Sequence, residues 1–281
     1  MSVRDLVIDL FAEHVDAVTQ EPVRLQSLVD LLGDLGVAEP TTRMATAALR
    51  RAGLLAASRR GRETLYTPTE RLRAMVRERQ ARLDDRMKPW DGYWGMVIYT
   101  VPESERAARE RVRRTLTRHG FGPLAPATWV SPHSGSLQDV RAELAGEPLA
   151  RLDLLTARVS GGTAGSDVEL MARCWDLSEV EAGYRALLGR LQTAADSPPP
   201  DGGSALVLHL RLLAELRRLL TEYPILPAAL RPPGWPGQEL CDAWTDVRAR
   251  LVGPAREHVA AVLADGVAGR PTQRYAAELS G

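Results

Sequence analysis

The side chains best suited to contact nucleic acid lie between residues 41 and 62. A helix expected from Thr41 to Arg51 carries hydroxyl and guanidinium groups on its predicted outer face. That outer face should contain Thr41, Thr42, Arg43, Thr46 and Arg50, with Met44, Ala47, Ala48 and Leu49 turned inward. In a DNA major groove, arginine can donate two hydrogen bonds to guanine, and threonine can contact the thymine methyl group. The same pattern taken alone is also compatible with an ordinary surface helix.

The expected roles within this helix differ by position. A recognition helix reads base edges through its N-terminal part, so we expect Thr41, Thr42, Arg43 and Thr46 to contact bases. Arg50 and Arg51 should contact phosphates, which position a protein on DNA without reading its sequence.

A second basic group follows at Arg59, Arg60 and Arg62, around Gly61. Short strands are expected at 54–58 and 64–67, so these arginines should lie at the tip of a hairpin. Such a group is often only solvated. Beside a recognition helix, however, arginine can enter a narrow minor groove or bind phosphate, and we favour DNA contact here.

The spacing of apolar residues predicts the helices and strands that position these arginines and threonines. Helical periodicity over 3–15 and 25–35 precedes the 41–51 helix and the hairpin, which together predict a winged helix-turn-helix over 1–70. A basic helical linker is expected over 71–89. From Pro40 to Arg82 there are eleven arginines and three glutamates, a net charge of +8 in a chain whose total formal charge is zero.

The rest of the chain is expected to form two further domains. Strand, helix, strand, helix and strand patterns alternate over 90–165, which predicts a ferredoxin-like α/β sandwich. The chain has helical spacing from Ser178 onward, and residues 166–281 are expected to form a helical C-terminal domain for effector sensing, dimerisation or both. The expected fold class is therefore α+β.

Composition argues against several other function classes. Cys174 and Cys241 stand alone in apolar surroundings, and the five histidines have no metal-ligand spacing, so neither a disulfide nor a metal site is expected. Catalytic and phosphate-binding motifs are missing, and we expect no catalytic residues and no cofactor. With no candidate leader or membrane span, a cytoplasmic location is expected.

Several dispersed motifs resemble the PaaX family of phenylacetate-degradation repressors. The resemblance covers nearly the whole chain and is most specific from Arg86 to Pro132, which contains KPWDGYW, VPE, GFG and WVSP. WDLSEVEAGYRALL and PPGWPG support it further along. Two positions depart from the family pattern: Ala48 replaces a frequent second arginine, and Thr100 replaces a common strand-end aspartate.

What the resemblance implies is a homodimeric repressor. It would bind double-stranded operator DNA near aromatic-catabolism genes and would leave it when an aryl-CoA thioester binds, typically phenylacetyl-CoA or another acyl-CoA. Aromatic rings could stack on the acyl group and arginines could pair with phosphate. The candidate effector residues are Trp90, Trp94, Arg106, Trp129, His133, Trp175, Tyr184 and Arg185. For any single tryptophan, core packing is the more common role.

Two other functions stay open on the sequence alone. The chain could be an architectural DNA-binding protein whose C-terminal helices only dimerise. It could also be a metal-dependent nuclease with a ferredoxin-like fold, but Thr100 cannot supply the strand-end carboxylate that a hard cation needs. We therefore expect a regulator and not an enzyme.

Overall fold

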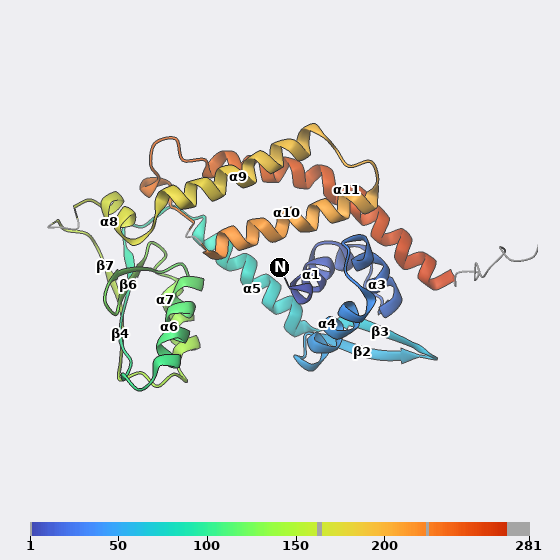
Figure 1. The fold of residues 1–281 in the computed structure, drawn as a ribbon, viewed down its shortest axis with the longest axis horizontal. Coiled ribbons are helices and arrows are strands. Elements are labelled where there is room, and N and C mark those ends of the chain that lie inside the picture. Colours follow the sequence, from blue (N-terminus) through green and yellow to red (C-terminus); the bar gives the residue numbers. More distant parts are fainter. Residues whose placement is uncertain (1, 162–164, 223–224, 269–281) are drawn as a thin grey trace, which may run out of the picture. The chain divides into compact units, whose positions relative to one another are not determined.

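The computed structural model describes residues 2–161, 165–222 and 225–268 (Figure 1). It divides into two compact units, each made of separate stretches of chain. The first unit comprises 1–77, 197–211 and 247–281, and the second comprises 78–196 and 212–246. The C-terminal helices therefore contribute to both units, a division that differs from the predicted domain boundaries.

The first unit begins with four helical segments built on apolar residues. They are α1 (Val3–Leu10), a π-helical turn η1 (Phe11–Val15), α2 (Asp16–Val18) and α3 (Leu25–Asp34). The Ser2 hydroxyl accepts a hydrogen bond from the backbone N–H of Asp5 and so caps α1, as its position predicts. Helix α4 (Glu39–Arg51) has Pro40 in its first turn, where the missing N–H costs nothing.

A small antiparallel sheet follows. Its strands are β1 (Val23–Arg24), β2 (Leu55–Arg60) and β3 (Glu63–Pro68), in the order β1-β3-β2. Arg60 and Glu63 are opposite each other in the register of β2 and β3. The turn between them has two residues, and Gly61 in it has a φ of 62°. A side chain is disfavoured at this φ, and glycine therefore permits the tight hairpin. Helix α5 (Glu70–Arg86) comes next.

Late segments of the chain complete the first unit. The beginning of α10 (Gly202–Glu222) and the second half of α11 (Gly237–Ala268) belong to it. These two helices approach closely at Gly202, where an added Cβ would lie 2.6 Å from the carbonyl oxygen of Pro254. Glycine at this position is therefore required by the packing.

Polar contacts join these late segments to the N-terminal helices. His14 Nε2 lies 2.8 Å from His209 Nδ1, with the two rings edge to face, and both side chains are fully buried. Arg248 Nη2 lies 2.9 Å from Glu13 Oε2. The guanidinium of Arg256 donates to the Glu13 carbonyl oxygen at 3.0 and 3.2 Å. These contacts link positions more than 190 residues apart in the sequence.

The second unit is built around a four-stranded antiparallel sheet. Its elements are β4 (Trp94–Thr100), α6 (Arg106–Arg118), β5 (Gly122–Ala125), β6 (Thr128–Ser131), α7 (Ser136–Leu144) and β7 (Arg151–Ala157). The strand order is β5-β6-β4-β7. Because side chains alternate along β4, Val97 and Tyr99 join the core beneath α6 and α7.

The opposite face of this sheet has a different cover. Trp94 and Val130 pack there against α8 (Asp167–Cys174) and the short helix η3 (Ala228–Leu230). Ser166 and Glu169 form a capping box at the start of α8. Helix α9 (Leu177–Asp196) follows. Gly122 has no room for a side chain, because an added Cβ would lie 2.6 Å from the Trp175 ring.

The α+β fold class is confirmed, and most predicted elements form where the sequence pattern placed them. Strand β5, strand β1 and helix α8 were not predicted. The SGGTAGS segment at 160–166, whose glycines and serines predict a loop, falls partly outside the described residues. Along the described ranges, no helix combines the length and the apolar character that a membrane crossing requires.

Acidification should destabilise the first unit, because His14 and His209 are buried in their neutral forms. Burial lowers the pKa of His14 to about 3, with a further contribution from His209, and lowers the pKa of His209 to about 4. Below the ordinary value of 6.5, the unfolded state therefore binds more protons than the folded state. Stability is fully present above that pH and is lost as the pH falls toward the folded-state values.

Each histidine should lower the free energy of unfolding by about 2 kcal/mol between neutral pH and about pH 5. Urea unfolding followed by circular dichroism measures this slope. The double variant His14→Gln/His209→Gln, which has no imidazole to protonate here, is the control for carboxylates elsewhere. An equal slope in variant and parent would contradict the assignment.

Candidate nucleic-acid interface

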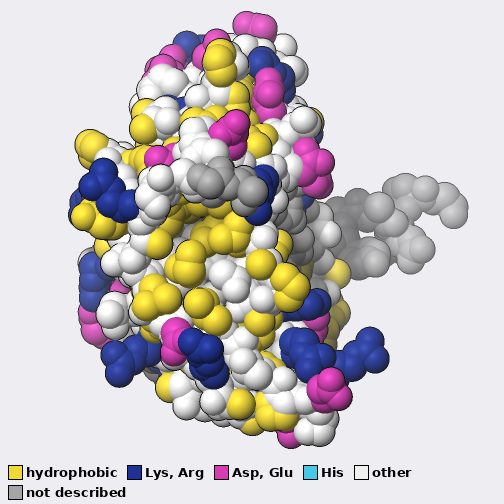
Figure 2. Space-filling model, turned by 90° about the vertical axis from the view of Figure 1, so that its left-hand side faces the viewer, with side chains coloured by type: hydrophobic (Ala, Val, Ile, Leu, Met, Phe, Trp, Pro, Cys, Tyr) yellow, Lys and Arg dark blue, Asp and Glu magenta, His cyan; other side chains and the backbone are white. Residues whose placement is uncertain are grey.

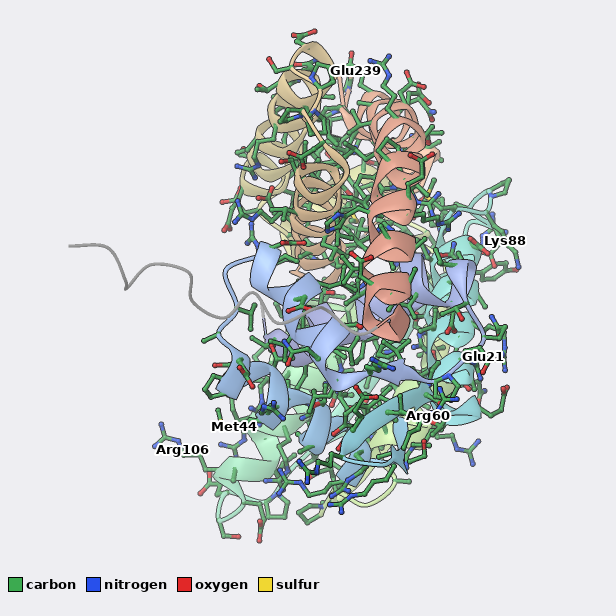
Figure 3. All side chains as sticks on the ribbon, turned by 90° about the vertical axis from the view of Figure 1, so that its right-hand side faces the viewer. Glu21, Met44, Arg60, Lys88, Arg106 and Glu239 are labelled. Atoms are coloured by element: carbon green, nitrogen blue, oxygen red, sulfur yellow. The ribbon has the colours of Figure 1, made fainter. Side chains whose placement is uncertain are left out.

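Helix α4 exposes a narrow polar face. Arg43, Met44, Arg50 and Arg51 are exposed, whereas Ala45 and Leu49 are buried in the core of the first unit. The side chain of Met44 is 65% exposed and extends outward in Figure 3. An exposed methionine on this helix offers a flexible apolar surface next to a guanidinium group.

The predicted outward orientation of Thr42 and Thr46 is wrong. Both side chains are completely buried, and the Thr46 hydroxyl donates to the carbonyl oxygens of Thr42 and Arg43. Thr42 Oγ1 has no hydrogen-bond partner among the described residues. The predicted inward orientation of Met44 is also wrong. Small threonines fill the close approach to the neighbouring helices, where methionine is too long, so the true inward face is rotated from the predicted one.

Arg43 is held along the helix by Glu39, one turn earlier. Its Nε lies 2.8 Å and its Nη2 lies 2.6 Å from Glu39 Oε1, and about half of each side chain is exposed. An exposed pair of this kind contributes only about 0–1 kcal/mol. A guanine or a phosphate can therefore compete with Glu39 for the guanidinium of Arg43.

The hairpin tip carries positive charge without internal compensation. Arg59, Arg60 and Arg62 are exposed, and Figure 3 shows the Arg60 side chain extending from the hairpin. The one nearby carboxylate, Glu63, lies 3.1 Å from Arg24. Across the part of the chain that the structure describes, these three arginines form no ion pair. They are free to contact phosphate or a minor groove.

The basic helix α5 is less available. Within the first unit, Arg73 pairs with Asp16 at 3.3 Å and donates to the carbonyl oxygen of Pro68, and Arg77 pairs with Glu70. Arg71 is exposed. The main uncompensated charge of this unit therefore lies on α4 and on the hairpin.

The candidate effector residues all lie in the second unit but do not line one common pocket. Trp90 and Trp94 contact each other edge to face, and their indole nitrogens donate to the Tyr93 carbonyl oxygen and to Asp167 Oδ1. His133 contacts the carbonyl oxygen of Ile225 at 2.7 Å. These side chains have structural roles.

The remaining candidate effector residues lie at several other places in the second unit. Tyr184 packs against Trp235, with burial raising its pKa to about 12, and Arg185 pairs with Glu181. Trp175 lies against Gly122, and Arg106 is exposed at the start of α6. Trp129 alone of the set lines a cavity formed by β4, α6 and the β5–β6 hairpin.

The cysteines and histidines do not form a reactive centre. Both thiols are free, and burial raises the pKa of Cys174 to about 11, which keeps it protonated and inert at neutral pH. Among the described residues, no group of three or more histidine, cysteine or carboxylate side chains is arranged to hold a metal ion. Thr100 ends β4 and is exposed, as its strand-end position predicts.

Comparisons with known proteins agree with the predicted resemblance. Residues 2–72 match the family model of PaaX-like protein, 87–168 that of the PaaX protein central Cas2-like domain, and 175–261 that of the PaaX-like protein C-terminal domain. The transcriptional repressor PaaX of Escherichia coli (strain K12) is 32% identical over 231 residues, 77% of this chain and 71% of that protein.

A solved structure is also similar. The uncharacterized protein Rv0674 from Mycobacterium tuberculosis is 27% identical and superposes with a TM-score of 0.62 over 92% of this chain and 98% of that one. The three consecutive family models and the Escherichia coli relative show that this chain belongs to the PaaX family.

Proposed function

We propose that this protein is a sequence-specific DNA-binding transcriptional repressor. The observation that carries the proposal is the uncompensated basic hairpin tip at Arg59, Arg60 and Arg62, one element after a helix with an exposed arginine near its start. Three helices followed by an antiparallel hairpin support a winged helix-turn-helix, in which α4 enters the major groove. The name of the Escherichia coli relative points the same way.

The proposed DNA contacts fall into two classes. Arg43 and Met44 occupy the N-terminal half of α4 and are placed to read base edges, with Thr41 half-buried beside them. Arg50, Arg51 and the hairpin arginines are placed to bind phosphates. Within the second unit, the β-α-β-β-α-β order of the sheet and its helices supports the ferredoxin-like interpretation of the central domain.

Base reading by Arg43 should be separable from backbone contact by Arg60. A binding site is first selected from a random DNA library with the parent protein. Arg43→Ala should weaken binding to that site by about 1–3 kcal/mol and leave binding to random DNA nearly unchanged. Arg60→Ala should weaken both equally and reduce the salt dependence by about one phosphate contact.

Fluorescence anisotropy on both DNAs at several salt concentrations makes this comparison. Arg4→Ala, which removes an exposed arginine of the same unit outside α4 and the hairpin, is the matched control and should bind like the parent. Equal losses on selected and random DNA for Arg43→Ala would remove Arg43 as a base reader.

We further propose that the protein acts as a homodimer. On the sheet face away from α6 and α7, Leu155 is 45% exposed next to its register partner Met96. Figure 2 shows hydrophobic side chains gathered on the side of the second unit that carries the sheet. This exposed apolar face supports a contact between two copies, and favours it over the C-terminal helices.

Light scattering should show a dimer for the parent and a monomer for Leu155→Glu, because a carboxylate cannot be buried unpaired between two apolar faces. Met87→Glu, at an exposed apolar residue that follows α5 and lies outside the sheet, should stay dimeric. A parent protein that is monomeric both alone and on DNA would contradict the proposal. A dimer that persists in Leu155→Glu would place the contact elsewhere.

The finer proposal is that an aryl-CoA thioester releases the protein from an operator of an aromatic catabolic operon. A ligand that binds the DNA-incompetent state more tightly by about 1.4 kcal/mol lowers DNA affinity tenfold. The experiment titrates the complex of protein and selected DNA with phenylacetyl-CoA, free CoA and phenylacetate, followed by fluorescence anisotropy. We expect release with the thioester only. If no acyl-CoA thioester changes the anisotropy or binds by calorimetry, the effector assignment fails.

A further inference from the structure

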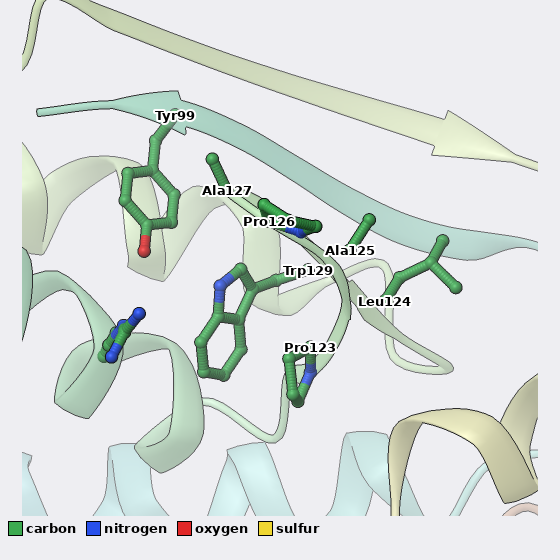
Figure 4. A pocket seen from close by; sticks show the side chains of 8 residues that line it. Tyr99, Pro123, Leu124, Ala125, Pro126, Ala127 and Trp129 are labelled. Atoms are coloured by element: carbon green, nitrogen blue, oxygen red, sulfur yellow. The ribbon is translucent and has the colours of Figure 1, made fainter.

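Three hydrogen-bond donors without acceptors surround one open cavity in the second unit. The cavity measures about 450 Å³ and lies between β4, the β5–β6 hairpin and α6 (Figure 4). Tyr99, Arg113 and Trp129 supply its polar groups, and Pro123, Leu124 and Pro126 supply apolar walls. Its volume is within the usual range for small-molecule sites.

The two aromatic donors face the open cavity. The Tyr99 and Trp129 residues are 4% and 9% exposed, and neither the phenol hydroxyl nor the indole N–H has a protein acceptor within the described ranges. Neither polar atom is among the buried atoms that lack a partner, so both reach solvent in the cavity. In Figure 4 both rings project to the same side of the sheet, which matches their common place in the core beneath α6.

The third donor adds positive charge. Arg113 is exposed on α6, and no carboxylate of the described chain pairs with its guanidinium. Two arginines of the same helix are neutralised, since Arg111 pairs with Glu147 at 2.8 Å and Arg118 pairs with Glu143. The cavity thus has donors and a cation but lacks an anionic acceptor.

The backbone of the cavity wall is held in a sparsely populated conformation. Ala127 has a φ of 57°, in the left-handed region that is unfavourable for a residue with a side chain. The Tyr99 backbone N–H donates to the Ala127 carbonyl oxygen at 3.0 Å, which anchors this turn to β4. Strained residues of this kind gather at ligand sites, where the surrounding structure maintains them.

We propose that this cavity binds a small organic anion that carries a flat apolar group, the chemistry of an aromatic carboxylate. The carboxylate would accept hydrogen bonds from the Tyr99 hydroxyl, the Trp129 indole N–H and the Arg113 guanidinium. The ring would lie against the Trp129 indole and the prolines. The inference does not rest on the proposed function and concerns binding alone, since release from DNA is still expected with the thioester only.

The experiment titrates the full chain without DNA by calorimetry, using benzoate, benzyl alcohol and acetate as probes. Benzoate should bind with a Kd of about 1 mM or tighter. Benzyl alcohol lacks the anion and acetate lacks the ring, so both should bind at least tenfold more weakly. Absence of benzoate binding, or equal binding of benzoate and benzyl alcohol, would overturn the proposal, and equal binding of acetate would overturn its apolar part.

Variants then locate the site. Arg113→Gln should lower benzoate affinity at least tenfold and Tyr99→Phe several-fold, whereas the neighbouring exposed Arg114→Gln should bind like the parent. A thermal melt of each variant checks folding, and Arg113→Gln tests the proposal at an exposed position where folding is not at risk. Equal affinity in Arg113→Gln and Arg114→Gln would overturn the site. Because DNA is absent, a failure to bind DNA leaves this result unaffected.

Discussion

The buried and partly buried contacts between the N-terminal helices and the late segments of the chain determine which surfaces of the first unit remain free. Glu13 and His14 face Arg248, Arg256 and His209, and these groups occupy one side of the N-terminal helices. The exposed face of α4 and the hairpin are left to carry the unpaired arginines. A basic surface in a chain of zero net charge therefore depends on where its carboxylates are engaged.

The buried contact between His14 and His209 contributes more to selecting one packing of α10 on the N-terminal helices than to the free energy of unfolding. Replacing both partners of a buried hydrogen bond by apolar groups of the same shape can be nearly neutral, whereas removing one partner leaves a buried polar group unsatisfied at a cost of about 1–3 kcal/mol. The His14 and His209 rings meet at 2.8 Å, and one nitrogen must donate while the other accepts. Such a directional contact selects one register of α10 against α1 and η1, and the apolar neighbours would tolerate several.

The sequence was sufficient for most elements of the fold, but not for the orientation of each side chain on α4. Helical spacing located α4, since Leu49 and the alanines recur at the correct period. It misplaced Thr42, Thr46 and Met44, because hydrophobicity was taken as the guide to burial. Size and local hydrogen bonding decide burial where helices approach closely, and both depend on neighbours distant in sequence.

The long-range contacts were beyond the reach of periodicity for a related reason. Nothing near His14 indicates a partner such as His209, and β1 and β5 are too short for an alternating pattern to appear. The family resemblance supplied what spacing could not, the expectation of a homodimeric repressor with an acyl-CoA effector. It did not identify which aromatic residues meet a ligand, because family motifs mark structural and functional tryptophans alike.

Hydrogen-bond satisfaction separates these two kinds of tryptophan better than residue type does. The indole N–H groups of Trp90 and Trp94 donate to acceptors within the second unit, so their hydrogen bonding is satisfied by the protein itself. The Trp129 ring is as buried as a core residue, but its N–H and the Tyr99 hydroxyl reach the solvent of one open cavity and have no protein acceptor among the described residues. A ligand that displaces this water can offer both donors an acceptor. These two polar groups beside an unpaired arginine are the basis on which we propose a ligand there, since packing alone would be served equally well by phenylalanine.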